Sequence, residues 1–390
     1  MKRRILIVLV LVIAVAGAGF FLLAPGIVER GMNKVEPVAL KPVSQRVAEL
    51  HSRLPVADMH ADTLLWSRSL IGNAGRGQVD LARLEAGNVS LQIFSSVTKT
   101  PKDQNYDSNG ADSDNITLLA FAQLQPPRTW SSLIERSLWH SAKLQRAESG
   151  SGGRLRIVRD GAGLGRLLAD RSRGRKVTGA LLSVEGLHNL EGDLANLDRL
   201  HAAGFRMAGL VHFFDNELGG SMHGERKGGL TPFGRKVVRR MEELGMIVDI
   251  AHSSPAVVRD ILEMARRPVV SSHGGVQATC KVNRNLDDDQ IRGIAATGGV
   301  IGIGYWDAAV CGTGPEAVAD AILHVRKVAG IDHVGLGSDF DGAVTTGFDT
   351  SKLAHLTQAL ADRGLTDEEI GKVMGGNVLR VLLQGMKPRA

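Results

Sequence analysis

Several histidine and carboxylate side chains follow apolar, strand-like runs of this sequence. They are His60, Asp62, Glu185, His212, His252, His273 and Asp339. Imidazole nitrogens and carboxylate oxygens are the ligands that zinc and similar divalent cations take in proteins. A single histidine in such a place is usually an ordinary core or loop residue. Its repetition at the ends of so many runs favours a metal site.

The spacing of three of these residues is compatible with a pair of metal ions. His60 and Asp62 are two positions apart, so on a strand their side chains point to the same side. Glu185 is an isolated carboxylate after the apolar run 180–184. Two divalent ions about 3.5–4 Å apart need a carboxylate that contacts both. We therefore predict a binuclear site in which Glu185 bridges the ions.

Eight apolar runs with strand-like composition recur from residue 55 onward, and helix-like stretches separate them. The runs are Val56–Asp62, Val89–Val97, Val177–Glu185, Phe205–Phe213, Met246–His252, Pro268–His273, Gly299–Trp306 and His333–Asp339. The clearest helical patterns cover 229–245, 254–266, 310–330 and 365–383. This alternation predicts an α/β fold, a closed (β/α)8 barrel of the TIM type. In such a barrel the carboxyl ends of the strands share one face, where the candidate ligands stand.

The interval 98–176 interrupts the alternation after the second strand. Its helical pattern predicts one long helix over 116–147, followed by the glycine- and serine-rich segment 149–153. We expect an insertion that covers one end of the barrel, as a lid would. The glycines of 161–165 follow no predicted strand, which argues against a dinucleotide-binding turn.

The amino terminus has the composition of a membrane anchor. Lys2, Arg3 and Arg4 precede the apolar segment 5–24, which is long enough to span a bilayer as a helix. Basic residues before a span stay in the cytoplasm, so the rest of the chain is expected on the periplasmic or extracellular side. The alternative is a signal peptide cleaved near 16–18, which would release a secreted protein. The predicted organisation is an anchor over 1–28, a linker over 29–48 and a barrel domain over 49–386 with the insertion at about 98–176.

The charge of the chain does not indicate a nucleic-acid partner. The formal net charge is +6, but half of that excess lies in the first 30 residues. Aromatic residues make up only 4% of the chain, which is too few for a base-stacking surface. Cys280 and Cys311 are the two cysteines. Outside the cytoplasm they could form a disulfide, or they could be two separate buried thiols.

The order of short motifs along the chain resembles the membrane dipeptidase (renal dipeptidase) family, the M19 metallopeptidases of the amidohydrolase-like barrels. The resemblance covers roughly residues 50–385 and depends on Asp58–Asp62, Ser183–Gly186, Leu210–His212, Asp249–His252, Pro268–His273, Arg284–Asn285, Gly335–Gly342 and Gly376–Arg380. It implies a zinc-dependent dipeptidase with two zinc ions per subunit and a dipeptide substrate. It also implies a disulfide between Cys280 and Cys311 and a homodimer, which is common in the family.

The resemblance also implies which residues hold the metal. His60 and Asp62 would hold one zinc ion, and His252 and His273 would hold the other. Glu185 would bridge the two ions. A hydroxide held between the ions would attack the peptide carbonyl.

Three further residues have roles that the resemblance implies in catalysis and substrate binding. Asp339 would orient the water, accept its proton and deliver it to the leaving amine. His212 would stabilise the oxyanion of the tetrahedral intermediate. Arg284 would bind the terminal carboxylate of the substrate through a planar two-pronged contact.

Two other functions remain open at this level. A related binuclear hydrolase would act on N-acyl amino acids, lactones, β-lactams or phosphoesters, although Arg284 favours a substrate with a free carboxylate. A barrel that binds ligands without catalysis is disfavoured, because such a protein is expected to have lost metal ligands and none is missing here.

Overall fold

Parallel strands alternate with helices along the chain in the computed structural model, which describes residues 2–72 and 75–386. Within these residues there are nine strands, all of them short. They are β1 (Val56–Ala61), β2 (Val89–Phe94), β3 (Leu155–Ile157), β4 (Thr178–Glu185), β5 (Phe205–Gly209), β6 (Ile247–Asp249), β7 (Val270–Ser271), β8 (Val300–Ile303) and β9 (Val334–Leu336).

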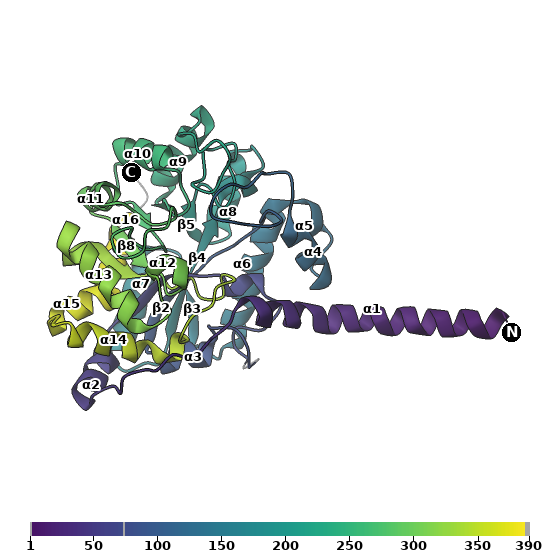
Figure 1. Cartoon of the computed structure of the whole chain (residues 1–390), viewed down its shortest axis with the longest axis horizontal. Helices are drawn as coiled ribbons and strands as arrows, with labels where there is room; N and C mark the ends of the chain where they lie inside the picture. Colours follow the sequence, from purple (N-terminus) through teal and green to yellow (C-terminus); the bar gives the residue numbers. More distant parts are fainter. Residues whose placement is uncertain (1, 73–74, 387–390) are drawn as a thin grey trace.

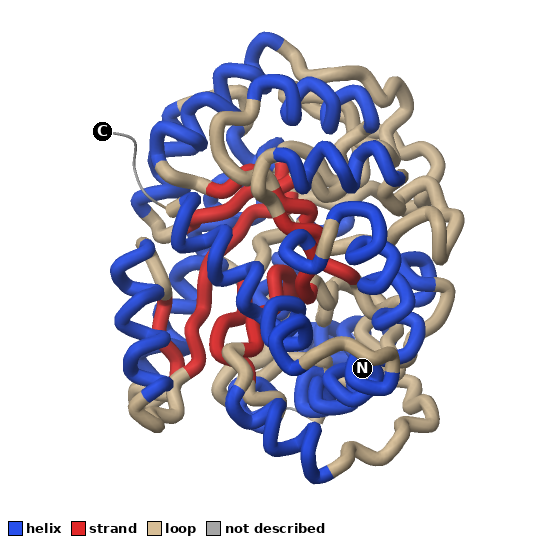
Figure 2. Tube along the Cα trace, turned by 90° about the vertical axis from the view of Figure 1, so that its left-hand side faces the viewer, coloured by secondary structure: helices blue, strands red, loops and turns tan. Residues whose placement is uncertain are grey.

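Eight of these strands form a closed parallel barrel. The ring runs from β1 through β9, β8, β7, β6, β5 and β4 to β2, and β2 pairs with β1 again. Figure 2 shows the strands at the centre with helices around them. The predicted (β/α)8 barrel is confirmed. Its strands are shorter at their carboxyl ends than the apolar runs indicated, because the chain leaves the sheet before it reaches most of the polar side chains.

Strand β3 lies outside this ring and was not predicted. It pairs with the first residues of β4, where Leu155 lies opposite Thr178 and Ile157 opposite Ala180. Helix α7 (Gly161–Ser172) follows it, so the expectation that no strand precedes the glycines of 161–165 was wrong. A strand of three residues is too short to show a periodic pattern. The glycines lie at the start of α7. The amide group of Gly163 donates a hydrogen bond to the side chain of Asp160, which caps the helix.

The helices that surround the barrel begin mostly at well-defined caps. The side chains of Thr231 and Ser254 accept hydrogen bonds at the starts of α9 and α10, and each is followed by a proline. Thr366 and Glu369 form a capping box. The helices are α2 (Gln45–Arg53), α3 (Leu81–Ala86), α8 (Ala195–Ala202), α9 (Pro232–Leu244), α10 (Pro255–Met264), α11 (Asp288–Ala296), α12 (Asp307–Val310), α13 (Pro315–Ala329), α14 (Leu353–Asp362), α15 (Asp367–Gly371) and α16 (Asn377–Gly385).

Several single turns connect these elements. Those of the 3-10 type are η1 (Thr63–Leu65), η2 (Leu187–Leu190), η3 (Ile331–His333) and η4 (Thr350–Lys352). A π-helical turn, η5 (Lys372–Gly376), separates α15 from α16. The helix predicted over 365–383 is therefore two helices joined by this turn.

The interval between β2 and β4 also differs from its prediction. The single helix expected over 116–147 is three helices, α4 (Asn115–Ala122), α5 (Arg128–Ser131) and α6 (Leu133–Gly150). Pro126 and Pro127 account for the break between α4 and α5. Proline lacks the amide hydrogen and disfavours the helical conformation at the residue before it. Leu124, just before them, has a left-handed backbone with φ of 53°.

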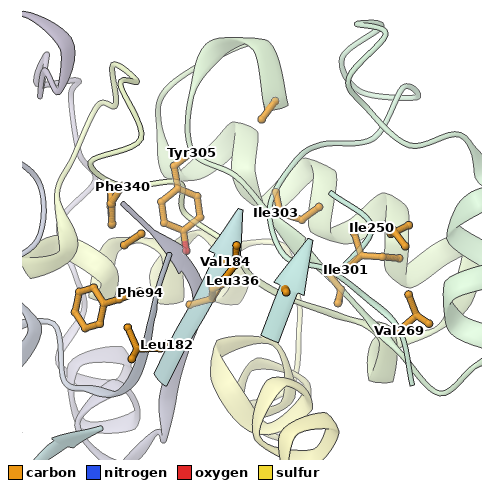
Figure 3. Packing of buried hydrophobic residues seen from close by; sticks show 14 of the residues in the cluster. Phe94, Leu182, Val184, Ile250, Val269, Ile301, Ile303, Tyr305, Leu336 and Phe340 are labelled. Carbon is orange, nitrogen blue, oxygen red and sulfur yellow. The ribbon is translucent and has the colours of Figure 1, made fainter. Parts of the chain in front are cut away.

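The core of the barrel holds the loop after β9 in place. Side chains from β2, β4, β8 and β9 gather there, as Figure 3 shows. The ring centres of Tyr305 and Phe340 lie 5.4 Å apart, and those of Tyr305 and Phe348 lie 5.3 Å apart. Phe340 is buried between Asp339 and Asp341. Removal of a buried phenylalanine ring costs about 3–5 kcal/mol, so this packing fixes the loop that carries Asp339.

Helix α1 (Lys2–Met32) is long and apolar enough to cross a membrane, a property that a signal sequence shares. Figure 1 shows it projecting from the barrel as one rod, with α4 and α5 near its base. The segment predicted as a linker, 29–48, starts inside this helix. Beyond the helix, the amide groups of Glu36 and Val38 donate to the carbonyl groups of Thr346 and Gly347, so this part of the segment lies against the barrel.

Candidate metal and active site

The predicted site residues meet at the carboxyl end of the barrel. His60 lies within β1, Asp62 directly follows that strand, and Glu185 is the last residue of β4. The other candidates lie two or three residues beyond strands β5, β6, β7 and β9, in the order His212, His252, His273 and Asp339. All seven side chains are buried. The parallel order of the strands brings them together, as the sequence predicts.

Glu185 lies at the centre of the cluster, and its two carboxylate oxygens face different partners. Its Oε1 is 2.8 Å from His252 Nε2 and 3.2 Å from His273 Nε2. Its Oε2 is 3.6 Å from His60 Nε2. His212 Nε2 lies 3.6 Å from Oε1. This is the arrangement that a carboxylate shared between two cations needs.

Asp339 belongs to the same cluster as His60 and Asp62. His60 Nε2 is 3.5 Å from Asp62 Oδ1 and 3.8 Å from Asp339 Oδ1. The ligand atoms of these three residues all lie within 4.8 Å of one another. The same holds for two further groups, His60 with Glu185 and His273, and Glu185 with His212 and His252. Asp339 therefore lies close enough to contact a cation held by His60 and Asp62.

Unpartnered polar atoms support the presence of cations at these positions. His60 Nε2 and Asp62 Oδ1 are buried without a hydrogen-bond partner, which is costly unless another group satisfies them. His252 Nε2 and His273 Nε2 point at each other across 3.0 Å. Since Glu185 Oε1 lies near both nitrogens, a cation there would convert close polar contacts into ligand bonds. The donor set of imidazole and carboxylate fits zinc.

The protonation states of His252, His273 and Glu185 suit metal binding, whereas that of His60 does not. Burial lowers the pKa of His252 and His273 well below the usual range, so both imidazoles are neutral and can act as ligands. Burial alone would raise the pKa of Glu185, but the neighbouring imidazoles of His212 and His60 hold it well below its usual value. Burial would lower the pKa of His60, yet the carboxylates of Glu185 and Asp62 raise it well above normal. His60 must release this proton before it can bind a metal ion, so metal binding at His60 is coupled to the loss of a proton.

Two buried aspartates hold the strand ends that carry the candidate ligands. Asp58 accepts hydrogen bonds from the amide groups of His60, at 3.0 Å, and Ser338, at 3.1 Å. Asp249 accepts from the amide groups of Ala251, at 3.0 Å, and Ser272, at 2.9 Å. Each carboxylate therefore joins two neighbouring segments of the barrel mouth. The motif sequences contain both aspartates, but the spacing alone did not assign this role to them.

The backbone is strained at two of the candidate residues. His252 and Asp339 have φ angles of 64° and 59°, in the left-handed region that costs about 1–3 kcal/mol for such residues. Hydrogen bonds offset part of this cost, because the amide groups of Met222 and Gly342 donate to the carbonyl oxygens of His252 and Asp339. Such strain is typical of functional positions that the surrounding structure holds in place.

Arg284 is buried next to the histidine cluster and is 3% exposed. Its Nη1 donates to the carbonyl oxygen of His273 at 3.3 Å, and its guanidinium group lies 4.8 Å from the centre of the Trp306 ring. Among residues 2–72 and 75–386, no carboxylate forms an ion pair with it. A buried cation without an acidic partner favours an anionic group from a ligand.

The segment that carries Arg284 is closed by a disulfide. Cys280 and Cys311 are bonded, with their Cα atoms 5.2 Å apart. The side chain of Asn285 donates to the carbonyl oxygens of Cys280 and Ala309, which adds a second connection between the two ends. The disulfide implied by the resemblance is present.

A cavity of about 600 Å³ lies above the cluster. Its charged and imidazole residues are Asp62, Glu185, His212, His252, His273, Arg284 and Asp339, and the uncharged polar residues Thr100, Gln104 and Asn115 also line it. Tyr106 also lines it, and its hydroxyl group accepts a hydrogen bond from Trp306 Nε1 at 3.1 Å. The cavity thus joins the candidate metal ligands and the unpaired arginine in one space.

Sequence comparison identifies the family. A sequence model of the membrane dipeptidases, peptidase family M19, matches residues 44–387. The chain is 31% identical over 362 residues to the dipeptidase aclJ of Aspergillus oryzae. The aligned region covers 85% of this chain and 78% of that protein. The chain belongs to the membrane dipeptidase family. Membership implies a metal-dependent enzyme with small peptide substrates.

Solved structures of proteins with lower sequence identity share the fold of this membrane dipeptidase family member. The probable dipeptidase PvdM from Pseudomonas aeruginosa aligns with a TM-score of 0.75 at 22% identity, over 88% of this chain and 98% of that one. A metallopeptidase from Rhodobacter sphaeroides aligns with a TM-score of 0.71 at 24% identity, over 85% of this chain and 99% of that one. That structure contains a phosphinate mimic of the dipeptide L-Ala-D-Ala.

Some residues around the site of this membrane dipeptidase family member were not predicted from the sequence. Tyr106 comes from the 98–176 interval, where no motif marks it. His223 stacks on Phe213 with ring centres 4.6 Å apart, and its Nδ1 contacts the backbone oxygen of Tyr106. His188 contacts Thr98 instead. His223 thus supports the cavity wall through Phe213 and Tyr106. Neither His188 nor His223 belongs to a candidate metal group of the described residues.

Proposed function

We propose that this chain is a zinc-dependent dipeptidase that binds two ions per subunit and hydrolyses the peptide bond of dipeptides. The position of Glu185 carries the proposal, because its two carboxylate oxygens face two different sets of histidines. His60 and Asp62 would hold one ion, and His252 and His273 the other. When bound, the ions would supply an ionised water near neutral pH and polarise the peptide carbonyl.

Asp339 is the proposed proton carrier. Burial raises the pKa of its carboxyl group well above the usual range, and the charges of Asp62 and Glu185 add to this effect. A carboxyl group with a raised pKa can accept a proton from water and give it to the leaving amine. The strained backbone at Asp339 holds the carboxyl group over the cavity. Its place near His60 also makes it a candidate additional ligand.

His212 is proposed to stabilise negative charge on the carbonyl oxygen. It lines the cavity, and its Nε2 lies 3.6 Å from Glu185. Burial lowers its pKa, so the imidazole is neutral and can donate one hydrogen bond. A donor that faces the developing oxyanion lowers the barrier to attack on the peptide carbonyl.

Arg284 is proposed to bind the terminal carboxylate of the dipeptide. The guanidinium group is buried at the cavity, and Trp306 holds its plane. A charged donor next to the reaction centre selects short substrates, because only a free carboxylate close to the scissile bond can reach it. This contact favours dipeptides over longer peptides.

The amino-terminal helix supports a proposal for location. We infer that residues 1–28 anchor the chain in a membrane and that the barrel, residues 49–386, lies on the periplasmic or extracellular side. The basic residues Lys2, Arg3 and Arg4 before the apolar segment 5–24 favour this orientation. The disulfide is consistent with a compartment outside the cytoplasm. Secretion after cleavage is the alternative, and a homodimer is proposed from the family resemblance.

Metal analysis with a substrate panel tests the proposed activity. The full chain in detergent micelles is expected to contain two zinc ions and to hydrolyse dipeptides. A chelator should abolish the activity, and added zinc should restore it. The panel includes N-acyl amino acids, lactones and β-lactams. Turnover of these compounds without dipeptide hydrolysis would favour the related hydrolase and reject the proposal.

His252→Ala tests the ligand assignment, with His333→Ala as its matched control. His333 lies in the turn before β9, away from the candidate ligands. His252→Ala is expected to lose zinc and to have a kcat/KM on the order of 1000-fold lower than the wild type. His333→Ala should keep the zinc content and the kcat/KM of the wild type. Full zinc content and activity in His252→Ala would contradict the assignment.

A further inference from the structure

One face of helix α1 borders the cavity above the candidate metal site. The side chains on that face recur at helical spacing, so they point the same way. They are Phe20, Ala24, Pro25, Val28 and Met32. The end of the apolar amino-terminal helix is therefore a wall of the same space that contains Glu185 and Arg284.

Buried polar contacts fix this part of α1 to the barrel. Glu29 is fully buried, and its carboxylate pairs with Arg68, which is also buried, and with Arg76 at 2.7 Å. Arg68 in turn pairs with Asp341, two positions after Asp339. Farther along the chain, Asn33 accepts a hydrogen bond from the amide group of Ala343 at 2.8 Å. The helix face next to the cavity is thus held in one position.

Helix α4 adds a second apolar wall beside α1. Ile116 and Leu119 line the cavity, and the rings of Phe121 and Phe21 meet with their centres 5.3 Å apart. The two helices together form the outer part of the cavity. The charged and imidazole groups come from the barrel, so the cavity is polar on the barrel side and mostly apolar along α1 and α4.

The size of the cavity exceeds what the polar end groups of a dipeptide require. A volume of about 600 Å³ is in the range that accommodates drug-sized ligands. The amino and carboxyl termini and the scissile bond of a dipeptide would contact the polar barrel side. Most of the other side chains that line the cavity are apolar, although Thr100, Gln104 and Asn115 are among them. This mostly apolar lining favours an apolar group of the substrate.

We propose that the end of α1 is a specificity-determining wall and that the preferred substrates are dipeptides with a large apolar side chain. This inference rests on the proposed dipeptidase activity and adds its substrate class. Val28 and Met32 are the residues that contact this side chain. Both line the cavity, and their side chains are 42% and 44% exposed to solvent, so their replacement leaves the core intact.

The test compares two dipeptides on the full chain in lipid nanodiscs. Leucyl-leucine represents a large apolar side chain, and alanyl-alanine represents a small one. In the wild type, kcat/KM is expected to be at least about 10-fold higher for leucyl-leucine, since one methylene group in an apolar pocket changes discrimination by about 10–200-fold. The double variant Val28→Ser, Met32→Ser should lose most of this preference and keep its rate on alanyl-alanine.

Ile27→Ser is the matched control for the double variant. Ile27 lies on the same helix next to Val28, is 66% exposed and does not line the cavity. It should keep the wild-type preference. Equal rates for both dipeptides in the wild type, or an unchanged preference in the double variant, would overturn the inference alone. Absence of any dipeptide hydrolysis by the zinc-loaded wild type would instead reject the proposed function.

Discussion

Glu29 and Arg68 form a buried ion pair between the amino-terminal helix and the barrel, with Oε1 and Nε 2.5 Å apart. The two residues are 39 positions apart in the sequence, and neither side chain is appreciably exposed. Arg68 also contacts Asp341 in the loop that carries Asp339. The amino-terminal helix and the candidate active site therefore share one charge network.

Glu29→Gln is expected to destabilise the protein. It removes one charge from a buried pair, which typically costs 3–5 kcal/mol. Because Arg68 keeps Asp341 as a partner, we expect the low end, about 3 kcal/mol. The free energy of unfolding in a denaturant titration measures this. Glu36→Gln, at an exposed position, is the control and should change stability by less than about 0.5 kcal/mol.

Arg284→Ala is expected to lower kcat/KM for a dipeptide about 100-fold, as loss of a buried charge contact costs 2–5 kcal/mol. Arg284→Lys should recover only part of this, because lysine lacks the planar two-donor group. The decisive comparison uses the same dipeptide with its carboxyl terminus amidated. If Arg284 binds the carboxylate, the variants and the wild type should hydrolyse the amide at similar rates. An equal loss on both substrates would contradict this role.

The disulfide is expected to stabilise the fold and to position Arg284. Cys280 and Cys311 are 31 positions apart, and closing a loop of that length is worth about 3.5 kcal/mol in the chain-entropy account. The double variant Cys280→Ser, Cys311→Ser should lose that stability. Its KM should rise several-fold while kcat changes little, because Arg284 lies within the closed loop. A reductant should lower the stability of the wild type and raise its KM. It should change neither quantity in the double variant.

His140 is expected to make the stability depend on pH below neutrality. Burial, with the nearby charges of Lys143 and Arg136, lowers its pKa in the folded protein to about 3, whereas an unfolded histidine has a pKa of about 6.5. As the pH falls below 6.5, the unfolded chain therefore takes up a proton that the folded protein does not. Stability is lost as the pH falls from about 6.5 toward 3, by about 2 kcal/mol at pH 5.

His140→Asn removes this group and tests its contribution. The variant is expected to lose about 2 kcal/mol less than the wild type between pH 7 and pH 5. Denaturant titrations at the two pH values measure the difference. The same pH dependence in both proteins would show that His140 is not the responsible group.

The barrel and the cluster of candidate metal ligands were predictable because both depend on local patterns. Apolar runs of strand composition recur with helices between them, and a parallel barrel necessarily brings their carboxyl ends to one face. A residue type at the end of a run, such as His252 or Glu185, therefore indicates its position in space. The extent of each strand was less predictable, because side-chain contacts such as those of Asp249 take over from the sheet at the strand ends.

The contacts of the amino-terminal segment were not predictable from its sequence. Glu29 follows an apolar segment and precedes Arg30, a pattern typical of a solvated end of a span. Only the folded chain brings Arg68 and Arg76 to it. Strand β3 escaped prediction because three residues carry no periodicity. The break before α5 could have been expected from Pro126 and Pro127, which outweigh the helical pattern around them.

The continuity of α1 with the barrel limits how the enzyme can move. For a chain anchored as we propose, a rigid rod joins the bilayer to the catalytic face, so the barrel cannot tumble on its own and must rotate with the span. Because Phe20 and Ala24 of this span also line the cavity, the cavity then lies at a fixed position next to the membrane surface. A fluorophore on the barrel would therefore report the slow rotational correlation time of the whole embedded molecule.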